Sequence, residues 1–125
     1  MQKVQKGFTL IELVVVIVLL GILGVTALAK FQDLSADAQA AATAGVAAEF
    51  SSGSSINYAA RSLNGANGEI TANVDCDVVA TRVMTVKPAG YTFGGGTTSA
   101  SNGVTNFCTV TAGTTSASAA VISIN

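Results

Sequence analysis

One apolar stretch near the start of the sequence constrains this chain more than any other feature. From Phe8 to Ala29, Glu12 is the only charged residue. A helix of this length spans roughly 33 Å at about 1.5 Å per residue, which is enough to cross a bilayer. An ionised glutamate at the edge of the membrane core costs about 2.5 to 3.5 kcal/mol on insertion scales. The retention of Glu12 therefore requires a physical reason.

The charges that flank the apolar stretch predict its orientation. Lys3 and Lys6 precede it and Lys30 follows it, so we expect a cytoplasmic amino terminus and export of the remaining chain. Cys76 and Cys108 then lie in an oxidising compartment. Beyond the first seven residues acids outnumber bases, so no nucleic-acid partner is expected.

A secretory signal peptide is the main alternative for this segment. It has a positive start, an apolar centre and a small-x-small site at residues 27–29, and cleavage after Ala29 would release a soluble protein that begins at Lys30. However, no breaker follows, and helix-forming residues continue through Phe50. We therefore predict one helix from Phe8 to near Ser54, with 8–29 in the membrane or a filament core and 30–54 as an amphipathic extension.

The chain after Ser54 changes character and predicts a small globular head, residues 55–125. Turn or loop signals recur in "SSGSS", "NGANGE", "GGGTTSASNG" and "TAGTTSASAA". The strand candidates between them are 70–80, where apolar residues alternate, and 91–93, 106–111 and 121–124. We expect an α+β fold in which the long helix packs on a small antiparallel sheet.

The head has roughly 70 residues with few aromatic side chains, so a covalent link would stabilise it. Cys76 and Cys108 can form a disulfide that closes about 33 residues, for about 3 to 4 kcal/mol in the chain-entropy model. Two free thiols are the alternative, which an oxidising compartment disfavours. We expect Tyr91, Phe93 and Phe107 in the head's core rather than exposed as adhesive aromatics.

The residues Lys6-Gly7-Phe8-Thr9-Leu10-Ile11-Glu12-Leu13 resemble the prepilin processing site of type IV pilins. The resemblance implies a leader, residues 1–7, that a prepilin peptidase removes after Gly7, and a new terminal Phe8 that is N-methylated. It also implies that Glu12 pairs with the Phe8 amine of a neighbouring subunit during assembly. Such a cation would offset the cost of a carboxylate in apolar surroundings. Within the family, the stretch "VTALAKFQDLSADAQAAA" and the cysteines look most like mannose-sensitive haemagglutinin (MSHA) pilins.

The resemblance implies a structural protein, a homo-oligomeric filament subunit used for adhesion and biofilm formation. It would be handled by the pilus assembly machinery, held in the inner membrane with a periplasmic head, and then displayed as an extracellular pilus. The surface or receptor that it binds is not indicated. Many members carry a proline where this chain has Ala29, so Gly21 and Gly24 remain as the flexible points of the helix. The disulfide-bounded region, 76–108, and the chain after Cys108 would form the outer face of the filament.

Two other functions fit parts of the sequence. A pseudopilin of a type II secretion apparatus shares the amino-terminal motif, although its head often lacks the disulfide. The other is a soluble exported binding domain cleaved after Ala29. No enzyme is expected, since the chain has no histidine and no nucleophile elbow. We predict no cofactor and no metal site, since Asp75 and Asp77 alone provide too few oxygens for calcium.

Overall fold

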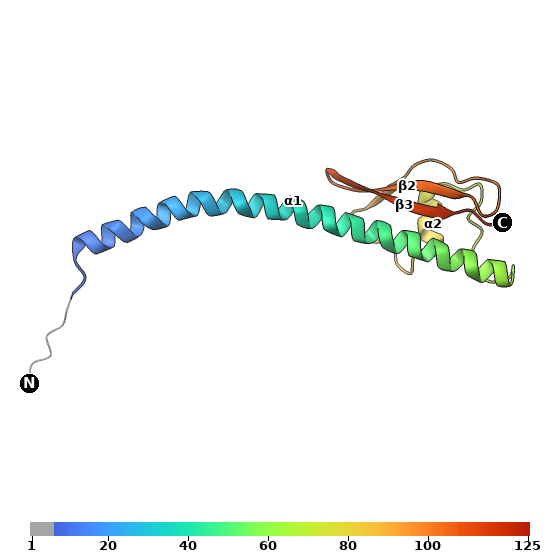
Figure 1. Cartoon of the computed structure of the whole chain (residues 1–125), viewed down its shortest axis with the longest axis horizontal. Helices are drawn as coiled ribbons and strands as arrows, with labels where there is room; N and C mark the ends of the chain where they lie inside the picture. Colours follow the sequence, from blue (N-terminus) through green and yellow to red (C-terminus); the bar gives the residue numbers. More distant parts are fainter. Residues whose placement is uncertain (1–6) are drawn as a thin grey trace, which may run out of the picture. The chain divides into compact units, whose positions relative to one another are not determined.

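The computed structural model describes residues 7–125. The chain divides into two compact units, one that ends at Asp37 and one that runs from Ala38 to Asn125. The elements are α1 (Leu10–Leu63), α2 (Cys76–Val83), β1 (Thr92–Gly94), β2 (Thr105–Ala112) and β3 (Thr115–Ile122) (Figure 1). Of the predicted leader, 1–7, only Gly7 belongs to the described residues.

The described part of the first unit is mainly the amino-terminal part of α1, which has no charged side chain between Leu13 and Ala29. Its most apolar 18-residue window has a mean hydropathy of 2.8, and none of that window is buried. A helix with apolar residues around its whole circumference is typical of a membrane span or of the interior of an assembly. By length and composition alone, α1 can cross a membrane.

Within the second unit, α1 ends at Leu63 rather than near Ser54 as predicted. The segment "SSGSS", which suggested a turn, is helical, and two of its serines bond to the helix backbone. Ser51 Oγ donates to the Ala47 carbonyl at 2.9 Å, and Ser55 Oγ donates to the Ser51 carbonyl at 3.0 Å. Such bonds satisfy serine hydroxyls that otherwise favour turns, and packing against the sheet supplies the remaining stability.

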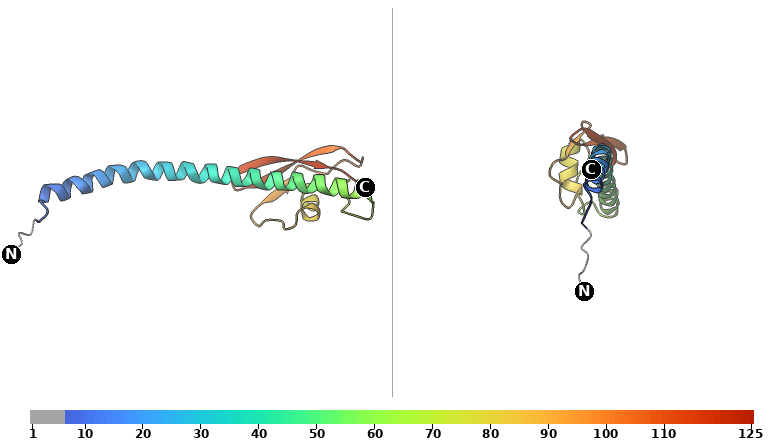
Figure 2. Two further views of the ribbon diagram at one scale, coloured as in Figure 1. Left: turned by 60° about the horizontal axis from the view of Figure 1, so that its bottom comes forward. Right: turned by 90° about the vertical axis from the view of Figure 1, so that its left-hand side faces the viewer.

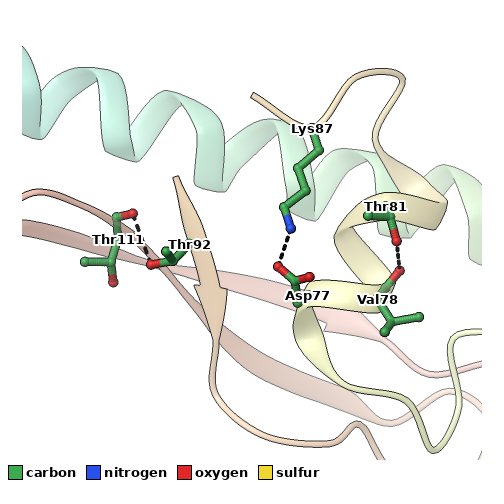
Figure 3. Close-up of polar contacts among 6 residues, drawn as sticks. All are labelled: Asp77, Val78, Thr81, Lys87, Thr92 and Thr111. Carbon is green, nitrogen blue, oxygen red and sulfur yellow. Dashed lines mark hydrogen bonds and ion pairs between the residues drawn. The ribbon is translucent and has the colours of Figure 1, made fainter. Parts of the chain in front are cut away.

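The sheet has the strand order β1-β2-β3 and is antiparallel throughout. β2 and β3 form a hairpin in which Ala112 pairs with Thr115. Gly113 has a φ of 57°, a conformation that suits glycine at the first position of a two-residue hairpin turn. Thr92 on β1 donates from Oγ1 to the Thr111 carbonyl on β2 at 3.4 Å (Figure 3). The predicted α+β fold with a small antiparallel sheet is confirmed.

The strand predicted over residues 70–80 is wrong, because Cys76–Val83 forms the helix α2. Cys76, Val79 and Ala80 are buried, and their spacing of three and four residues places them on one face of a helix. The alternation of apolar residues suggested a strand because a short apolar run can fit the two-residue period of a strand as well as the 3.6-residue period of a helix. Thr81 Oγ1 donates to the Val78 carbonyl within α2 (Figure 3).

The core of the second unit lies where α1, α2 and the sheet meet. Phe50 of α1 and Phe93 of β1 contact edge to face, with ring centroids 5.3 Å apart. Val79, Val110 and Val121 are completely buried around them. β2 and β3 run alongside this part of α1 in Figure 1 and in the left-hand view of Figure 2.

Candidate functional site

The start of α1 is the first candidate site, because the processing and assembly residues predicted from sequence lie there. Phe8 is 89% exposed, and a Cβ placed on the exposed Gly7 would meet no atom within 4 Å. The Gly7–Phe8 peptide bond therefore projects into open space, as a cleavage site requires. Cleavage after Gly7 and methylation of Phe8 stay predictions.

Glu12 has a local partner that the sequence analysis did not identify. Thr9 donates to Glu12 Oε2 twice, from its backbone N–H at 2.9 Å and from its hydroxyl at 2.7 Å. In return the Glu12 N–H donates to Thr9 Oγ1 at 3.4 Å. This reciprocal arrangement is a capping box at the first turn of the helix. The signal was present in the sequence as Thr-x-x-Glu ahead of an apolar run.

Both bonds from Thr9 end on the same carboxylate oxygen, Oε2, so the other oxygen of Glu12 can accept further hydrogen bonds. Among the described residues, Oε1 of Glu12 has no hydrogen-bond partner. A carboxylate accepts several hydrogen bonds through its two oxygens. The capping box and an ion pair with a second molecule are therefore compatible at one side chain.

Gly21 and Gly24 lie within the continuous helix α1, so the structure shows no break at either residue. A Cβ at either position would meet no atom within 4 Å. Thr26 Oγ1 donates to the Leu23 carbonyl at 2.9 Å within the same part of the helix. The predicted flexibility at Gly21 and Gly24 remains a prediction about the assembled state.

The predicted disulfide between Cys76 and Cys108 is present, with the two Cα atoms 5.8 Å apart. Both residues are buried in the core of the second unit. The bond connects the first residue of α2 to the middle of β2. It therefore fixes a helix that has only eight residues against the sheet.

The region expected to form the outer face, residues 76–108 and the chain after Cys108, is only partly exposed. Phe93 is buried as predicted and Tyr91 is half-buried, whereas Phe107 is 69% exposed and the prediction that it lies in the core is wrong. Phe107 alternates with the buried Cys108 along β2, so it projects from the opposite face of the sheet. The chain after Cys108 is mostly β2 and β3, and Ala119 lies in the core.

The two carboxylates considered for calcium have other partners. Asp77 pairs with Lys87 (Figure 3), and Asp75 Oδ1 accepts from Thr97 Oγ1 at 2.9 Å. Within residues 7–125 no group of three or more metal-ligating side chains comes together. These two bonds link the start of α2 to Lys87, which follows the helix, and to Thr97.

Comparison with known proteins gives short matches to an amino-terminal motif and one longer match. Residues 2–28 match a family model described as the prokaryotic N-terminal methylation motif. A type IV major pilin protein PilE1 of Neisseria gonorrhoeae is 56% identical over 39 residues, which are 31% of this chain and 24% of that protein. A fimbrial protein of Pseudomonas aeruginosa is 51% identical over 37 residues, 30% of this chain and 24% of the relative.

A third relative matches over a longer stretch. Fimbrial protein EcpC of Eikenella corrodens is 34% identical over 111 residues, covering 67% of this chain and 72% of the relative. No solved structure matches the chain. None of these three relatives is named as a mannose-sensitive haemagglutinin pilin, so that narrower resemblance stays a prediction. The extent of the match with the Eikenella protein, beside the methylation motif on α1 and the disulfide-linked α+β head, shows that the chain belongs to the type IV pilin family.

Proposed function

We propose that this chain is the structural subunit of a type IV pilus and polymerises through the amino-terminal part of α1. The observation that carries the proposal is that no residue in the apolar window of α1 is buried. So much apolar surface is stable only in lipid or against other apolar helices. The membrane would hold the subunit before assembly, and the helices of neighbouring subunits would replace the lipid in the filament.

Processing precedes assembly in this proposal. A prepilin peptidase cuts after Gly7, and the new terminal amine of Phe8 is methylated and stays protonated. Before assembly the amino terminus is cytoplasmic and the head periplasmic, and the assembled pilus is extracellular. The exposure of Gly7 and Phe8 supports access of a peptidase to this bond.

Assembly then pairs Glu12 of one subunit with the Phe8 amine of its neighbour. The capping box supports this geometry, because Thr9 fixes the Glu12 side chain through Oε2 while Oε1 can accept from an incoming ammonium. In apolar surroundings, an unpaired carboxylate is costly and a paired one much less so. The ion pair would therefore favour the register in which every Glu12 meets an amine.

Substitutions at Glu12 separate the two roles of this side chain. Glu12→Ala removes both the cap and the charge, and its subunits should enter the membrane at least as well but yield few filaments. Glu12→Gln retains a carbonyl oxygen for the capping box and removes only the charge. The measurement is the amount of subunit in sheared surface filaments relative to the amount in the membrane.

The Gln variant decides the mechanism. A filament yield as low as that of Glu12→Ala supports charge pairing. A normal yield from Glu12→Gln would show that Glu12 acts through helix capping alone. Intact-mass analysis of the exported protein tests the assignment itself, since a chain that begins at Lys30 instead of Phe8 contradicts a pilin subunit.

For adhesion and biofilm formation, we propose that exposed loops of the head supply the contact surface. Residues 94–97 and 100–105 are exposed and neutral, and the exposed Phe107 lies on the outer face of β2. An antibody raised against residues 100–105 should decorate intact filaments in electron micrographs. Failure to bind intact filaments, with binding to dissociated subunits, would place this loop inside the assembly.

A further inference from the structure

Three Asn-Gly pairs lie in exposed loops of the head, at residues 64–65, 67–68 and 102–103. Such pairs are chemically reactive. The glycine amide nitrogen attacks the asparagine side-chain carbon Cγ, the Cγ–Nδ2 bond breaks, and ammonia leaves with the proton from the glycine nitrogen. Water then opens the resulting succinimide to aspartate or isoaspartate. Glycine favours the reaction because it has no Cβ to hinder ring closure.

We propose that Asn64 is a site of spontaneous deamidation in the folded protein and that the fold protects Asn102. The two pairs have the same sequence, so the difference between them comes from the tertiary structure. The reaction needs only water and the folded head, and it is independent of the proposed role in a pilus.

The electrophile at Asn64 is polarised by the backbone. The Ala66 N–H donates to Asn64 Oδ1 at 3.0 Å. This oxygen gains negative charge when the Gly65 nitrogen adds to Cγ. A hydrogen-bond donor already directed at such an oxygen lowers the barrier.

The nucleophile, the backbone nitrogen of Gly65, is not held by a hydrogen bond. Within the described part of the chain, no acceptor receives a hydrogen bond from the Gly65 N–H. A Cβ at Gly65 would meet no atom within 4 Å, so no neighbour crowds this residue, and the carbonyl of the same peptide, on Asn64, accepts from the Asn67 N–H at 2.8 Å while the Gly65 N–H stays unbonded. Because α1 ends at Leu63, the continuing helix does not hold this peptide in place.

At Asn102 and Gly103 the nucleophile is bonded, whereas the electrophile is polarised as it is at Asn64. The Gly103 N–H donates to the Ser123 carbonyl at 2.9 Å. Asn102 Oδ1 accepts from the Asn125 N–H at 2.6 Å, which is a polarising bond like that at Asn64. The difference is therefore the nucleophile, since ring closure at Asn102 requires loss of the Gly103–Ser123 bond.

Asn67 has an intermediate environment. The Gly68 carbonyl accepts from Arg61 Nη1 at 3.3 Å. A Cβ built on Gly68 would lie 2.6 Å from Asn57 Oδ1, so this backbone is packed closely against α1. No donor to the Asn67 side chain exists among the described hydrogen bonds. We place its rate between those of Asn64 and Asn102.

Deamidation would change the charge at the end of α1. Its product is a carboxylate that is ionised at neutral pH, next to the carboxyl end of a helix, where negative charge is unfavourable. Arg61 in the last turn is the nearest available counter-charge along the chain. An isoaspartate would also lengthen the backbone of the loop that leads out of α1.

The test follows all three asparagines in one sample. The full chain, folded in detergent, is incubated at mildly alkaline pH in water labelled with heavy oxygen, so that only newly formed carboxylates carry the label. After reduction of the disulfide and digestion with trypsin, fragment spectra distinguish Asn64 from Asn67 within residues 62–82. We expect Asn64 to react roughly tenfold faster than Asn102, as expected for a competing hydrogen bond of ordinary strength.

Two controls separate the fold from the sequence. In denaturant the three sites should react at similar rates, because each is an Asn-Gly pair. Gly65→Ala is compatible with the local backbone and should slow reaction at Asn64 without changing Asn102. Equal rates in the folded chain, or Asn67 or Asn102 reacting first, would overturn the proposal.

Discussion

At the scale of single residues, buried polar side chains on α1 connect the helix to the rest of the head. Thr43 and Ser54 are completely buried. Thr43 Oγ1 and Thr115 Oγ1 are 2.9 Å apart, and Ser54 Oγ accepts from the Ile122 N–H at 2.8 Å. Ser51 Oγ likewise accepts from the Ala120 N–H at 2.9 Å. Ser51 and Ser54 thus accept from two N–H groups on the outer edge of β3, which would otherwise be available for pairing with another chain.

Ser54→Ala should destabilise the head by about 1 to 3 kcal/mol, because it leaves the Ile122 N–H without an acceptor. The matched control is Ser55→Ala. Ser55 is exposed and its hydroxyl bonds only to the Ser51 carbonyl, so the change should stay within about 0.5 kcal/mol. Denaturant unfolding of both variants measures the difference. Equal stabilities would mean that water replaces the Ser54 hydroxyl at this edge.

At the scale of elements, α1 and α2 approach closely at Gly53. A Cβ at Gly53 would lie 2.5 Å from the Val83 carbonyl oxygen and 3.2 Å from its carbon. Both contacts are with backbone, which cannot move aside as a flexible side chain would. The glycine therefore sets how closely the end of α2 packs against α1.

Gly53→Ala should cost about 1 to 3 kcal/mol, because α2 must shift to relieve the overlap. Gly45→Ala is the control on the same helix, since a Cβ there meets no atom within 4 Å. Alanine at that position should stabilise the helix by about 0.5 to 1 kcal/mol. Opposite signs in the shift of the unfolding midpoint check the prediction. A stabilised Gly53→Ala variant would contradict the close packing.

The disulfide acts at the same scale, because Cys76 and Cys108 are separated by 32 positions in the sequence. The double substitution Cys76→Ala and Cys108→Ala should lower the free energy of unfolding by about 3 to 4 kcal/mol. Unfolding curves of this variant and of the native protein, without reductant, measure the loss. With reductant present the two curves should approach each other. A variant as stable as the oxidised protein would show that packing alone holds α2.

At the scale of the whole molecule, the two units have opposite solvent requirements. Every buried side chain of the described residues belongs to the second unit, 38–125. Among the described residues the first unit has no buried side chain, and most of its exposed surface is apolar. Stability of the head and attachment to a membrane or filament are therefore separate properties of one chain.

A chain shortened to begin at Lys30 should consequently be soluble without detergent. Its head should unfold at nearly the same temperature as the head of the full chain, because no core residue is removed. Circular dichroism during heating, with the full chain in detergent as reference, gives the comparison. A shortened chain that aggregates or has lost its cooperative transition would show that the first unit contributes to the core.

The sequence by itself determined the features that depend on composition and strong periodicity. The apolar part of α1, the Cys76–Cys108 pair and the strand at 106–111 were all predictable. The capping box of Thr9 and Glu12 was readable from its spacing as well. Each of these signals is local, or depends on an inventory of only two cysteines.

Only the tertiary structure decided the features that depend on distant partners. Residues 76–83 form a helix because Cys76, Val79 and Ala80 fit one face against the core, although a short alternating run fits a strand equally well. α1 continues to Leu63, and beyond Ser54 it is held by bonds of Asn57 to the Glu69 backbone and of Arg61 to the Gly68 and Asn125 carbonyls. The fold brings the Ser123 carbonyl to the Gly103 N–H, whereas among the described residues no acceptor reaches the Gly65 N–H. In each case, a contact between segments far apart in sequence outweighs a weak local preference.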